Sequence, residues 1–196
     1  MSGVPGAGDV GRVERLARAH AAACDGFVFA GGDDPRTERY GEPTHPRANP
    51  VHPDRQAYEE ALLRVLDEPA FAHKPVLGVC LGMQMMALHR GGSLVQHMPD
   101  EIPTHADHMD DRVHEIEPCE THAAVRGGAI TSWHRQCVRS AGSMRIVARA
   151  PDGVIEAIDD PARAFYVGVQ WHPERTRDAA LGDDVFRALV GAVRGA

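Results

Sequence analysis

The chain has 196 residues, of which 43% are hydrophobic and 25% charged, as in soluble globular proteins. This length suits one hydrophobic core, so we expect a single domain over residues 1–196. The net charge of −7 argues against a nucleic-acid partner, because such proteins usually carry a basic surface. No stretch approaches the roughly 20 apolar residues of a membrane span, and no secretory signal is visible. These features predict a cytoplasmic protein that makes no membrane contact.

The first half of the chain alternates amphipathic helical windows with short apolar runs. We predict helices over residues 10–24, from 54 to before Pro69, and over 81–90, and strands over 26–30 and 76–79. The second of these strands is apolar throughout, which is typical of a strand covered on both faces. Residues 33–53 are polar and proline-rich, so we expect a long loop there.

The second half begins with an irregular polar segment, residues 96–112. Short strands are expected near residues 112–116, 129–133, 145–150, 154–158 and 164–170, and an amphipathic helix near 185–193. This alternation predicts an α/β fold with three layers, in which a largely parallel central sheet carries helices on both faces.

The four cysteines are far apart in the sequence and form no C-x-x-C pair. They are Cys24, Cys80, Cys119 and Cys137. This spacing is typical of reduced thiols and differs from that of a disulfide framework or a zinc site.

Cys80 stands out because it lies between two glycines, in Gly78-Val79-Cys80-Leu81-Gly82, where a predicted strand meets a predicted helix. This pattern indicates a nucleophile elbow, a sharp turn that leaves no room for side chains beside the nucleophile. The helix would direct its N-terminal amides at the thiol, which favours thiolate and lowers the thiol pKa. The alternative is a small buried cysteine that happens to follow a strand.

A cysteine nucleophile needs a base, and the base needs an acceptor that orients it. The segment Val169-Gln170-Trp171-His172-Pro173-Glu174 offers both, because His172 follows a predicted strand and Glu174 can accept from its ring. The carboxyl ends of parallel strands meet at one edge of a sheet, so we expect His172 to lie near Cys80. The alternative is a surface histidine beside a carboxylate.

Six segments together resemble the class I glutamine amidotransferase superfamily and, within it, the γ-glutamyl peptide hydrolases typified by γ-glutamyl-γ-aminobutyrate hydrolase. They follow the order found in that family. They are Gly31-Gly32-Asp33-Asp34 with Tyr40-Gly41-Glu42, Gly78 to Gln84, Gly91-Gly92-Ser93-Leu94, Ser132-Trp133-His134-Arg135-Gln136, Pro151 to Ala157, and Gly168 to Glu174.

The resemblance implies a class I glutamine amidotransferase-like, flavodoxin-like fold and a Cys80–His172–Glu174 triad that cleaves a γ-glutamyl amide. It implies an oxyanion hole formed by the backbone amides of Gly32 and Leu81. It also implies substrate-binding roles for four polar residues, although His134 can equally be a satisfied polar group of the interior. These four are Gln84, Ser132, His134 and Gln136. No metal or organic cofactor is implied.

Leu81 departs from the pattern of the hydrolases, in which arginine is more usual at this position. Leucine at this position is common in glutaminase domains that feed ammonia to a partner synthase. Three functions therefore stay open: a γ-glutamyl hydrolase, a glutaminase subunit with a synthase partner, and a non-catalytic scaffold or regulatory protein. The Ser132-x-His134-x-Gln136 pattern favours the hydrolase.

The polar segment 96–112 is rich in histidine and acidic residues, which are also metal ligands. They are His97, Asp100, Glu101, His105, Asp107, His108, Asp110 and Asp111. Because their spacing matches no zinc signature, we expect a solvated loop near the substrate mouth and no metal site.

Members of the family usually begin with a strand, a helix and a second strand, for which the first nine residues here leave no space. The sheet would then lack at least one strand. An uncovered sheet edge favours association, so we predict a homodimer in which a second chain or residues 1–11 cover that edge.

Overall fold

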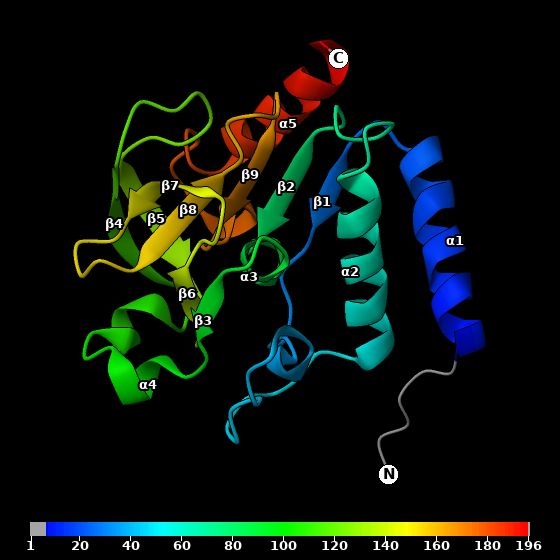
Figure 1. The fold of residues 1–196 in the computed structure, drawn as a ribbon. Helices are drawn as coiled ribbons and strands as arrows, with labels where there is room; N and C mark the ends of the chain where they lie inside the picture. The colour runs from blue at the N-terminus through cyan, green and yellow to red at the C-terminus, as the bar shows by residue number, and fades with distance from the viewer. Residues whose placement is uncertain (1–6, 196) are drawn as a thin grey trace.

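The computed structural model describes residues 7–195, which form one nine-stranded sheet flanked by helices (Figure 1). The main strand order is β1-β2-β9-β8-β7-β4-β5. The strands are β1 (Phe27–Phe29), β2 (Val76–Val79), β3 (Ser93–Val95), β4 (Arg112–Pro118), β5 (Gly128–Ser132), β6 (Cys137–Ser140), β7 (Arg145–Arg149), β8 (Ile155–Asp159) and β9 (Tyr166–Val169). The helices are α1 (Ala7–Ala23), α2 (Pro53–Leu66), α3 (Leu81–His89), α4 (Met98–Glu101) and α5 (Asp183–Gly195).

The α/β class is confirmed, but the sheet is mixed and not largely parallel. Only β1, β2 and β9 run parallel to one another. From β8 outward every pairing is antiparallel, including the short β3–β6 ladder beside β8. The physical reason is local: β7 and β8 are joined by the Pro151-Asp152-Gly153 turn, and a tight turn can only connect antiparallel neighbours.

Alternate residues of the central strands point into two hydrophobic clusters, one on each face of the sheet. Val76 packs with residues of α1, α2 and α3, whereas its neighbour Leu77 packs with residues of α5. Tyr166 and Val167 of β9 divide in the same way. The expected three layers are therefore present, with α1 and α2 side by side next to β1 (Figure 1).

Most expected elements are present within a few residues of their predicted bounds. Strands β3 and β6 were not predicted, because three or four residues carry too little pattern to be recognised. The two segments expected to be irregular contain α4 and two single-turn 3-10 helices, Thr37–Tyr40 and His105–His108.

Strand β1 lies at one end of the sheet and, within residues 7–195, pairs only with β2. Phe27 and Phe29 are buried, whereas Val28 is 49% exposed. Residues 1–6, which belong to the segment predicted to cover this edge, lie outside the described part of the chain.

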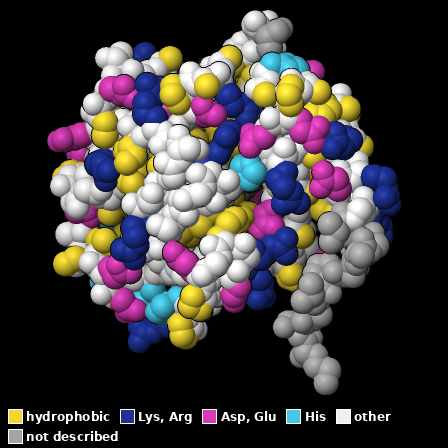
Figure 2. Space-filling view, in the orientation of Figure 1, with side chains coloured by type: hydrophobic (Ala, Val, Ile, Leu, Met, Phe, Trp, Pro, Cys, Tyr) yellow, Lys and Arg dark blue, Asp and Glu magenta, His cyan; other side chains and the backbone are white. Residues whose placement is uncertain are grey.

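The surface carries acidic and basic side chains interspersed over the face shown in Figure 2, where no extended basic region is present. None of the helices in residues 7–195 combines the length and the apolar character needed to cross a bilayer.

Candidate active site

Cys80 occupies the elbow between β2 and α3 with φ 52° and ψ −105°, a backbone conformation that side-chain-bearing residues rarely adopt. The flanking glycines are required by close packing. A Cβ on Gly78 would lie 2.7 Å from the carbonyl carbon of Gly82, and a Cβ on Gly82 would overlap the carbonyl group of Phe29. The tight strand-to-helix turn predicted from the sequence is therefore present.

The thiol of Cys80 is buried under the segment that follows β5. Its Sγ lies 3.9 Å from the carbonyl oxygen of Trp133, to which it can donate. Burial raises the pKa of the Cys80 thiol to about 12, although a hydrogen bond from the Leu81 amide acts in the opposite direction. The expectation of a lowered pKa is thus wrong for this site, because desolvation of the thiolate outweighs the N-terminus of α3.

His172 and Glu174 form the predicted base and acceptor pair. The Nδ1 atom of His172 lies 2.7 Å from Oε1 of Glu174, and the carboxylate can only accept, so Nδ1 carries the proton and Nε2 is the basic nitrogen. The imidazole is largely buried, with 11% of its surface exposed, whereas the Glu174 side chain is 48% exposed.

Strand β5 fixes the backbone that carries this histidine. The His172 amide donates to the carbonyl oxygen of Thr131 over 3.0 Å. Thr176 closes the same turn, because its hydroxyl donates to the His172 carbonyl over 2.9 Å and accepts from the Thr131 amide over 3.1 Å. The position of His172 is therefore set by a neighbouring strand as well as by Pro173.

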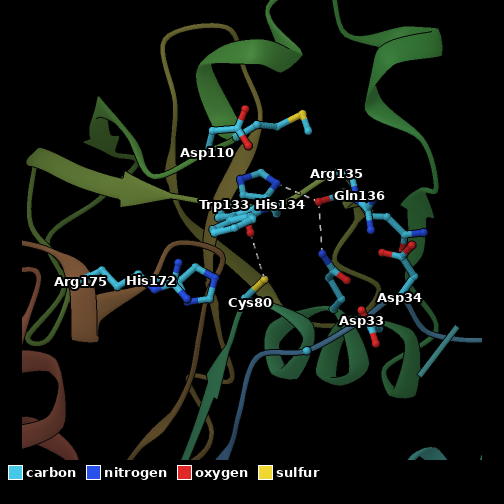
Figure 3. Close-up of a pocket in the computed structure, with 13 residues that line it drawn as sticks. Asp33, Asp34, Cys80, Asp110, Trp133, His134, Arg135, Gln136, His172 and Arg175 are labelled. Atoms are coloured by element: carbon cyan, nitrogen blue, oxygen red, sulfur yellow. Dashed lines mark hydrogen bonds between the residues drawn. The ribbon is translucent and has the colours of Figure 1, made fainter. Parts of the chain in front are cut away.

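Gly31 brings the nucleophile and the base together. A Cβ at this position would lie 3.6 Å from the Cβ of Cys80 and 3.2 Å from Cε1 of His172, so both side chains flank the same small residue. Figure 3 shows the His172 ring pointing toward Cys80. The expected meeting of these two side chains at one edge of the sheet is present.

Arg55, on α2, holds the glycine turn that follows β1. Its Nη2 donates to the carbonyl oxygens of Ala30 over 2.9 Å and of Gly31 over 3.1 Å. Because C=O and N–H point in opposite directions in a trans peptide, the amide of Gly32 is directed away from Arg55. Gly32 also lines the cavity at Cys80. Sequence reasoning missed Arg55, which lies in an ordinary amphipathic helix.

A cavity of about 490 Å³ opens above Cys80. Arg175 lies beside His172 on one side of the thiol, Asp33, Asp34 and Arg135 lie on the other side, and Asp110 lies above it in the view of Figure 3. The lining residues are Gly32, Asp33, Asp34, Cys80, Gln84, Met109, Asp110, Trp133, His134, Arg135, Gln136, His172 and Arg175.

Three of the four predicted substrate-binding residues line this cavity. Gln84 donates from Nε2 to the carbonyl oxygen of Gln136 over 3.1 Å, and Gln136 donates to the carbonyl oxygen of Gln96 over 2.8 Å. His134 is the third. Ser132 does not line the cavity, because it is fully buried inside β5.

The charged residues of the cavity were not singled out from the sequence, although Asp33, Asp34 and Arg135 lie within two motifs that were. Asn49 orients the acidic pair, because its side-chain amide donates to Asp33 over 2.9 Å and its backbone amide to Asp34 over 2.8 Å. Burial raises the pKa of Asp34, and the nearby Arg135 acts against this shift.

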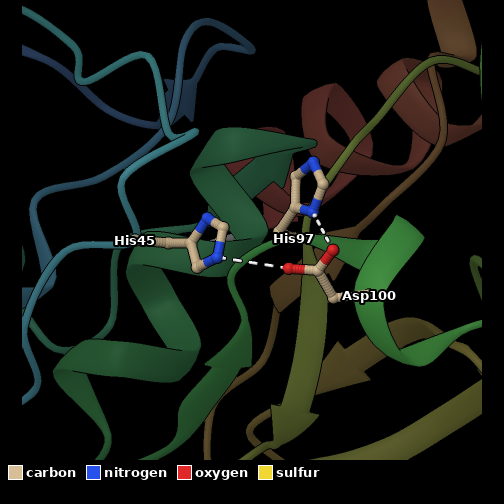
Figure 4. A group of neighbouring side chains, drawn as sticks. All are labelled: His45, His97 and Asp100. Atoms are coloured by element: carbon tan, nitrogen blue, oxygen red, sulfur yellow. Dashed lines mark ion pairs between the residues drawn. The ribbon is translucent and has the colours of Figure 1, made fainter.

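The segment 96–112 is only partly the solvated loop that was expected. Asp110 lines the cavity, but His108 is 1% exposed and packs beneath it, against Glu156. His97 lies elsewhere, stacked on His45 with Asp100 beside both rings (Figure 4).

The three-layer fold, the cysteine elbow and the adjacent histidine define a class I glutamine amidotransferase-like protein. The profile of the Peptidase C26 family matches residues 10–174, and the chain belongs to this family. The family resemblance and the α/β fold class are confirmed at this level.

Several proteins of known sequence are similar to the chain. A Mycobacterium tuberculosis protein named as a glutamine amidotransferase is 34% identical over 177 residues, which cover 86% of this chain and 56% of that protein. Protein NtpR of Enterococcus hirae is 32% identical over 86% of this chain and 74% of its own length. The γ-glutamyl-γ-aminobutyrate hydrolase PuuD of Escherichia coli K12 is 26% identical over 86% of this chain and 71% of its own length. The chain thus spans little more than half of the mycobacterial relative.

Solved structures show the same fold. A glutamine amidotransferase of Thermotoga maritima superposes with a TM-score of 0.52 at 17% identity, covering 86% of this chain and 61% of that one. The glutaminase domain of Trypanosoma brucei CTPS with bound acivicin gives a TM-score of 0.60 at 17% identity, covering 92% and 75%.

Proposed function

We propose that the protein hydrolyses a γ-glutamyl amide through a thioester on Cys80 and releases glutamate and an amine. The observation that carries this proposal is the arrangement at the cavity floor. A cysteine in a strained elbow faces a histidine whose outer nitrogen is bound by Glu174. The name of the relative PuuD supports the choice of a γ-glutamyl substrate.

In the first half-reaction, the Cys80 proton passes to Nε2 of His172 as sulfur attacks the γ-carbonyl carbon. Because the thiol pKa is raised, this proton moves as the C–S bond forms and not before. The amides of Leu81 and Gly32 hold the oxyanion. The intermediate collapses when the C–N bond breaks and His172 gives its proton to the leaving amine.

In the second half-reaction, water attacks the thioester carbon and gives a proton to His172. The C–S bond then breaks, glutamate leaves, and the proton returns to sulfur. Glu174 stabilises the imidazolium in both half-reactions, because it accepts from Nδ1 throughout.

The charged cavity suits the amino-acid end of a glutamyl group, which carries one ammonium and one carboxylate. Asp33 and Asp34 can bind the ammonium, and Arg135 beside them can bind the carboxylate. Arg175 is less available, since its Nη1 lies 2.7 Å from Oδ1 of Asp111. With the amino-acid end of the substrate bound by Asp33, Asp34 and Arg135, its γ-carbonyl group can lie at Cys80.

A substrate panel tests this proposal. Purified protein is incubated with γ-glutamyl amines, γ-glutamyl peptides and free glutamine, and both glutamate and ammonia are quantified, with Cys80→Ala as the blank. We expect glutamate from the amines or peptides without matching ammonia. Turnover of glutamine alone favours a glutaminase subunit with a synthase partner, and no turnover of any substrate favours a scaffold or regulatory role.

We further propose a cytoplasmic homodimer. All four cysteines are free thiols, and Cys24 and Cys119 are exposed, which fits a reducing compartment. Among the described residues 7–195, β1 pairs only with β2, so its other side offers a second chain a place to bind.

A further inference from the structure

Four titratable side chains meet in the interior beneath the catalytic cavity, and amide hydrolysis uses none of them directly. They come from four places in the fold: His108 from a 3-10 helix, His114 from β4, His134 from the segment after β5, and Glu156 from β8. Their side chains are 2%, 12%, 1% and 0% exposed, respectively.

All three imidazoles direct a nitrogen at the same carboxylate oxygen. Oε1 of Glu156 lies 3.2 Å from Nδ1 of His108, 3.8 Å from Nε2 of His114 and 3.6 Å from Nε2 of His134. None of these four atoms makes a hydrogen bond to any residue that the structure describes. Four buried polar atoms thus face one another without donors between them.

The opposite nitrogen of each imidazole is fixed by an acceptor. Nε2 of His108 lies 2.9 Å from a carboxylate oxygen of Asp152. Nδ1 of His114 lies 3.0 Å from the carbonyl oxygen of Glu115, and Nδ1 of His134 lies 2.8 Å from that of Gln136. Since these oxygens only accept, the outer nitrogens carry the protons. Each neutral ring therefore turns a bare lone pair toward Glu156.

Three lone pairs and a carboxylate repel one another unless positive charge lies between them. A protonated His108 would donate to both Glu156 and Asp152, but it would leave the lone pairs of His114 and His134 facing Glu156 with no positive charge between them. One divalent cation with neutral rings balances these two carboxylates. We propose that His108, His114 and Glu156, whose ligand atoms all lie within 4.8 Å of one another, bind one Zn²⁺ ion.

The geometry fits zinc in particular. With metal–ligand distances of about 2.0–2.1 Å, the donor atoms of a tetrahedral site lie roughly 3.3 Å apart, close to the 3.2 Å and 3.8 Å that separate Oε1 of Glu156 from the facing nitrogens of His108 and His114. Zinc-bound imidazoles usually donate their other N–H to a carboxylate or a carbonyl, as the rings of His108 and His114 do. A second cavity, of about 540 Å³, is lined by His108, His114 and Asp152 and gives the ion a path inward.

A zinc ion with these three protein ligands would keep a water molecule as its fourth ligand, and this water can donate to Nε2 of His134, which also faces Glu156. The role of the ion follows from His134 and Gln136, which line the catalytic cavity. The ion would fix the segment after β5, whose Trp133 carbonyl lies above Cys80. A zinc ion would thus hold one wall of the active site in place.

The chain offers a matched control in His45, His97 and Asp100 (Figure 4). There the two rings are stacked with centroids 5.0 Å apart, and the Asp100 side chain is 51% exposed. Water can solvate this carboxylate, so no cation is required.

The test uses the full chain without a histidine tag, stripped with a chelator and titrated with Zn²⁺ by calorimetry. We expect one equivalent to bind, and Glu156→Gln and His114→Gln to weaken binding at least about 100-fold. His97→Gln should bind as the wild type does. Circular dichroism verifies that each variant is folded, and Co²⁺ in place of zinc should give the visible absorption of a tetrahedral site.

The wild-type measurement alone can overturn the proposal. Failure of the folded wild type to bind a stoichiometric ion at micromolar Zn²⁺ would mean that protons, not a metal, balance Glu156. Binding that is lost in His97→Gln and kept in Glu156→Gln would place the ion at the exposed cluster instead. Neither result depends on catalytic turnover.

Discussion

The guanidinium of Arg55 donates to the carbonyl oxygen of Gly31 over 3.1 Å, and this contact orients the next amide, that of Gly32, away from Arg55. Arg55 is itself held by Glu59, one turn further along α2, over 2.9 Å. A side chain outside the cavity lining thereby positions one of the two proposed oxyanion donors.

We expect Arg55→Ala to lower kcat by a factor on the order of 10², because loss of one oxyanion donor has effects of that size, while KM changes little. Arg55→Lys should restore part of kcat, since an ammonium can still donate to one carbonyl. The matched control is Arg64→Ala on the exposed side of the same helix, which should leave both constants unchanged. A change in KM alone would assign Arg55 to substrate binding instead.

The cysteines should react with iodoacetamide in an order set by burial. Cys24 and Cys119 are exposed, whereas burial raises the pKa of both Cys80 and Cys137 to about 12. At pH 7 we expect labelling at the exposed pair first. The rate at Cys80 should rise about tenfold per pH unit well beyond pH 9, because only the thiolate reacts.

Peptide mass mapping after timed labelling measures each rate, and the same experiment in urea serves as the control, where all four thiols should react alike. A rate at Cys80 that is already constant near neutral pH would show a stable thiolate and contradict the burial argument.

The base and its acceptor should contribute unequally to catalysis. His172→Ala removes the only proton carrier of the mechanism, so kcat should fall by about 10³ or more. Glu174→Gln should lower it only about 10- to 100-fold, since an amide oxygen still accepts from Nδ1 and Glu174 is half exposed to water. Steady-state kinetics on both variants, with Glu14→Gln as the control, measure the difference. Equal rates for wild type and His172→Ala would mean that another base serves.

Sequence reasoning succeeds at this site where the ends of neighbouring strands decide which residues meet. Cys80 and His172 were predicted because each lies at the end of a buried strand, and parallel neighbours bring such ends together. Ser132 was grouped with the cavity residues because a motif does not show how deeply a strand residue is buried, and here it is fully buried and does not line the cavity. The raised pKa of Cys80 could not be predicted, since burial depends on the segment that folds over it.

The histidine cluster around Glu156 was missed for a related reason. Its members come from four separate segments with no shared spacing, and only the antiparallel half of the sheet brings them together. The polar character of segment 96–112 indicated solvent exposure, but His108 is buried against β8. The antiparallel strands, which the sequence pattern did not predict, therefore bring the residues of this cluster together.

Asp67, at the end of α2, should make stability depend on acid pH. Its carboxylate accepts from His89 over 2.7 Å and from Arg90 over 2.9 Å, and these contacts outweigh burial and lower its pKa. Because the folded-state pKa lies below the unfolded value of about 3.9, this stabilisation is present above pH 4 and is lost as pH falls through the folded pKa.

We therefore expect Asp67→Asn to lower the free energy of unfolding by about 1.5–3 kcal/mol at pH 7, the range for hydrogen bonds to charged groups. The effect should shrink below the folded-state pKa, where wild-type Asp67 is also neutral. Urea titrations at several pH values measure it, with the exposed Asp183→Asn as the control. An effect of equal size at every pH would show that charge is not involved.

The open side of β1 leads to the last prediction, the association state. Within residues 7–195 this strand pairs only with β2, and Val28 at its centre is 49% exposed, so unpaired backbone and an apolar side chain lie together at the sheet edge. We expect a symmetric dimer of twice 21.2 kDa by light scattering after size-exclusion chromatography. Val28→Lys should shift the equilibrium to monomer, because a charge at an edge strand opposes pairing, whereas Val190→Lys on α5, at a similarly exposed position, should not. A wild-type protein that is a stable, active monomer at low micromolar concentration would show that this edge needs no partner.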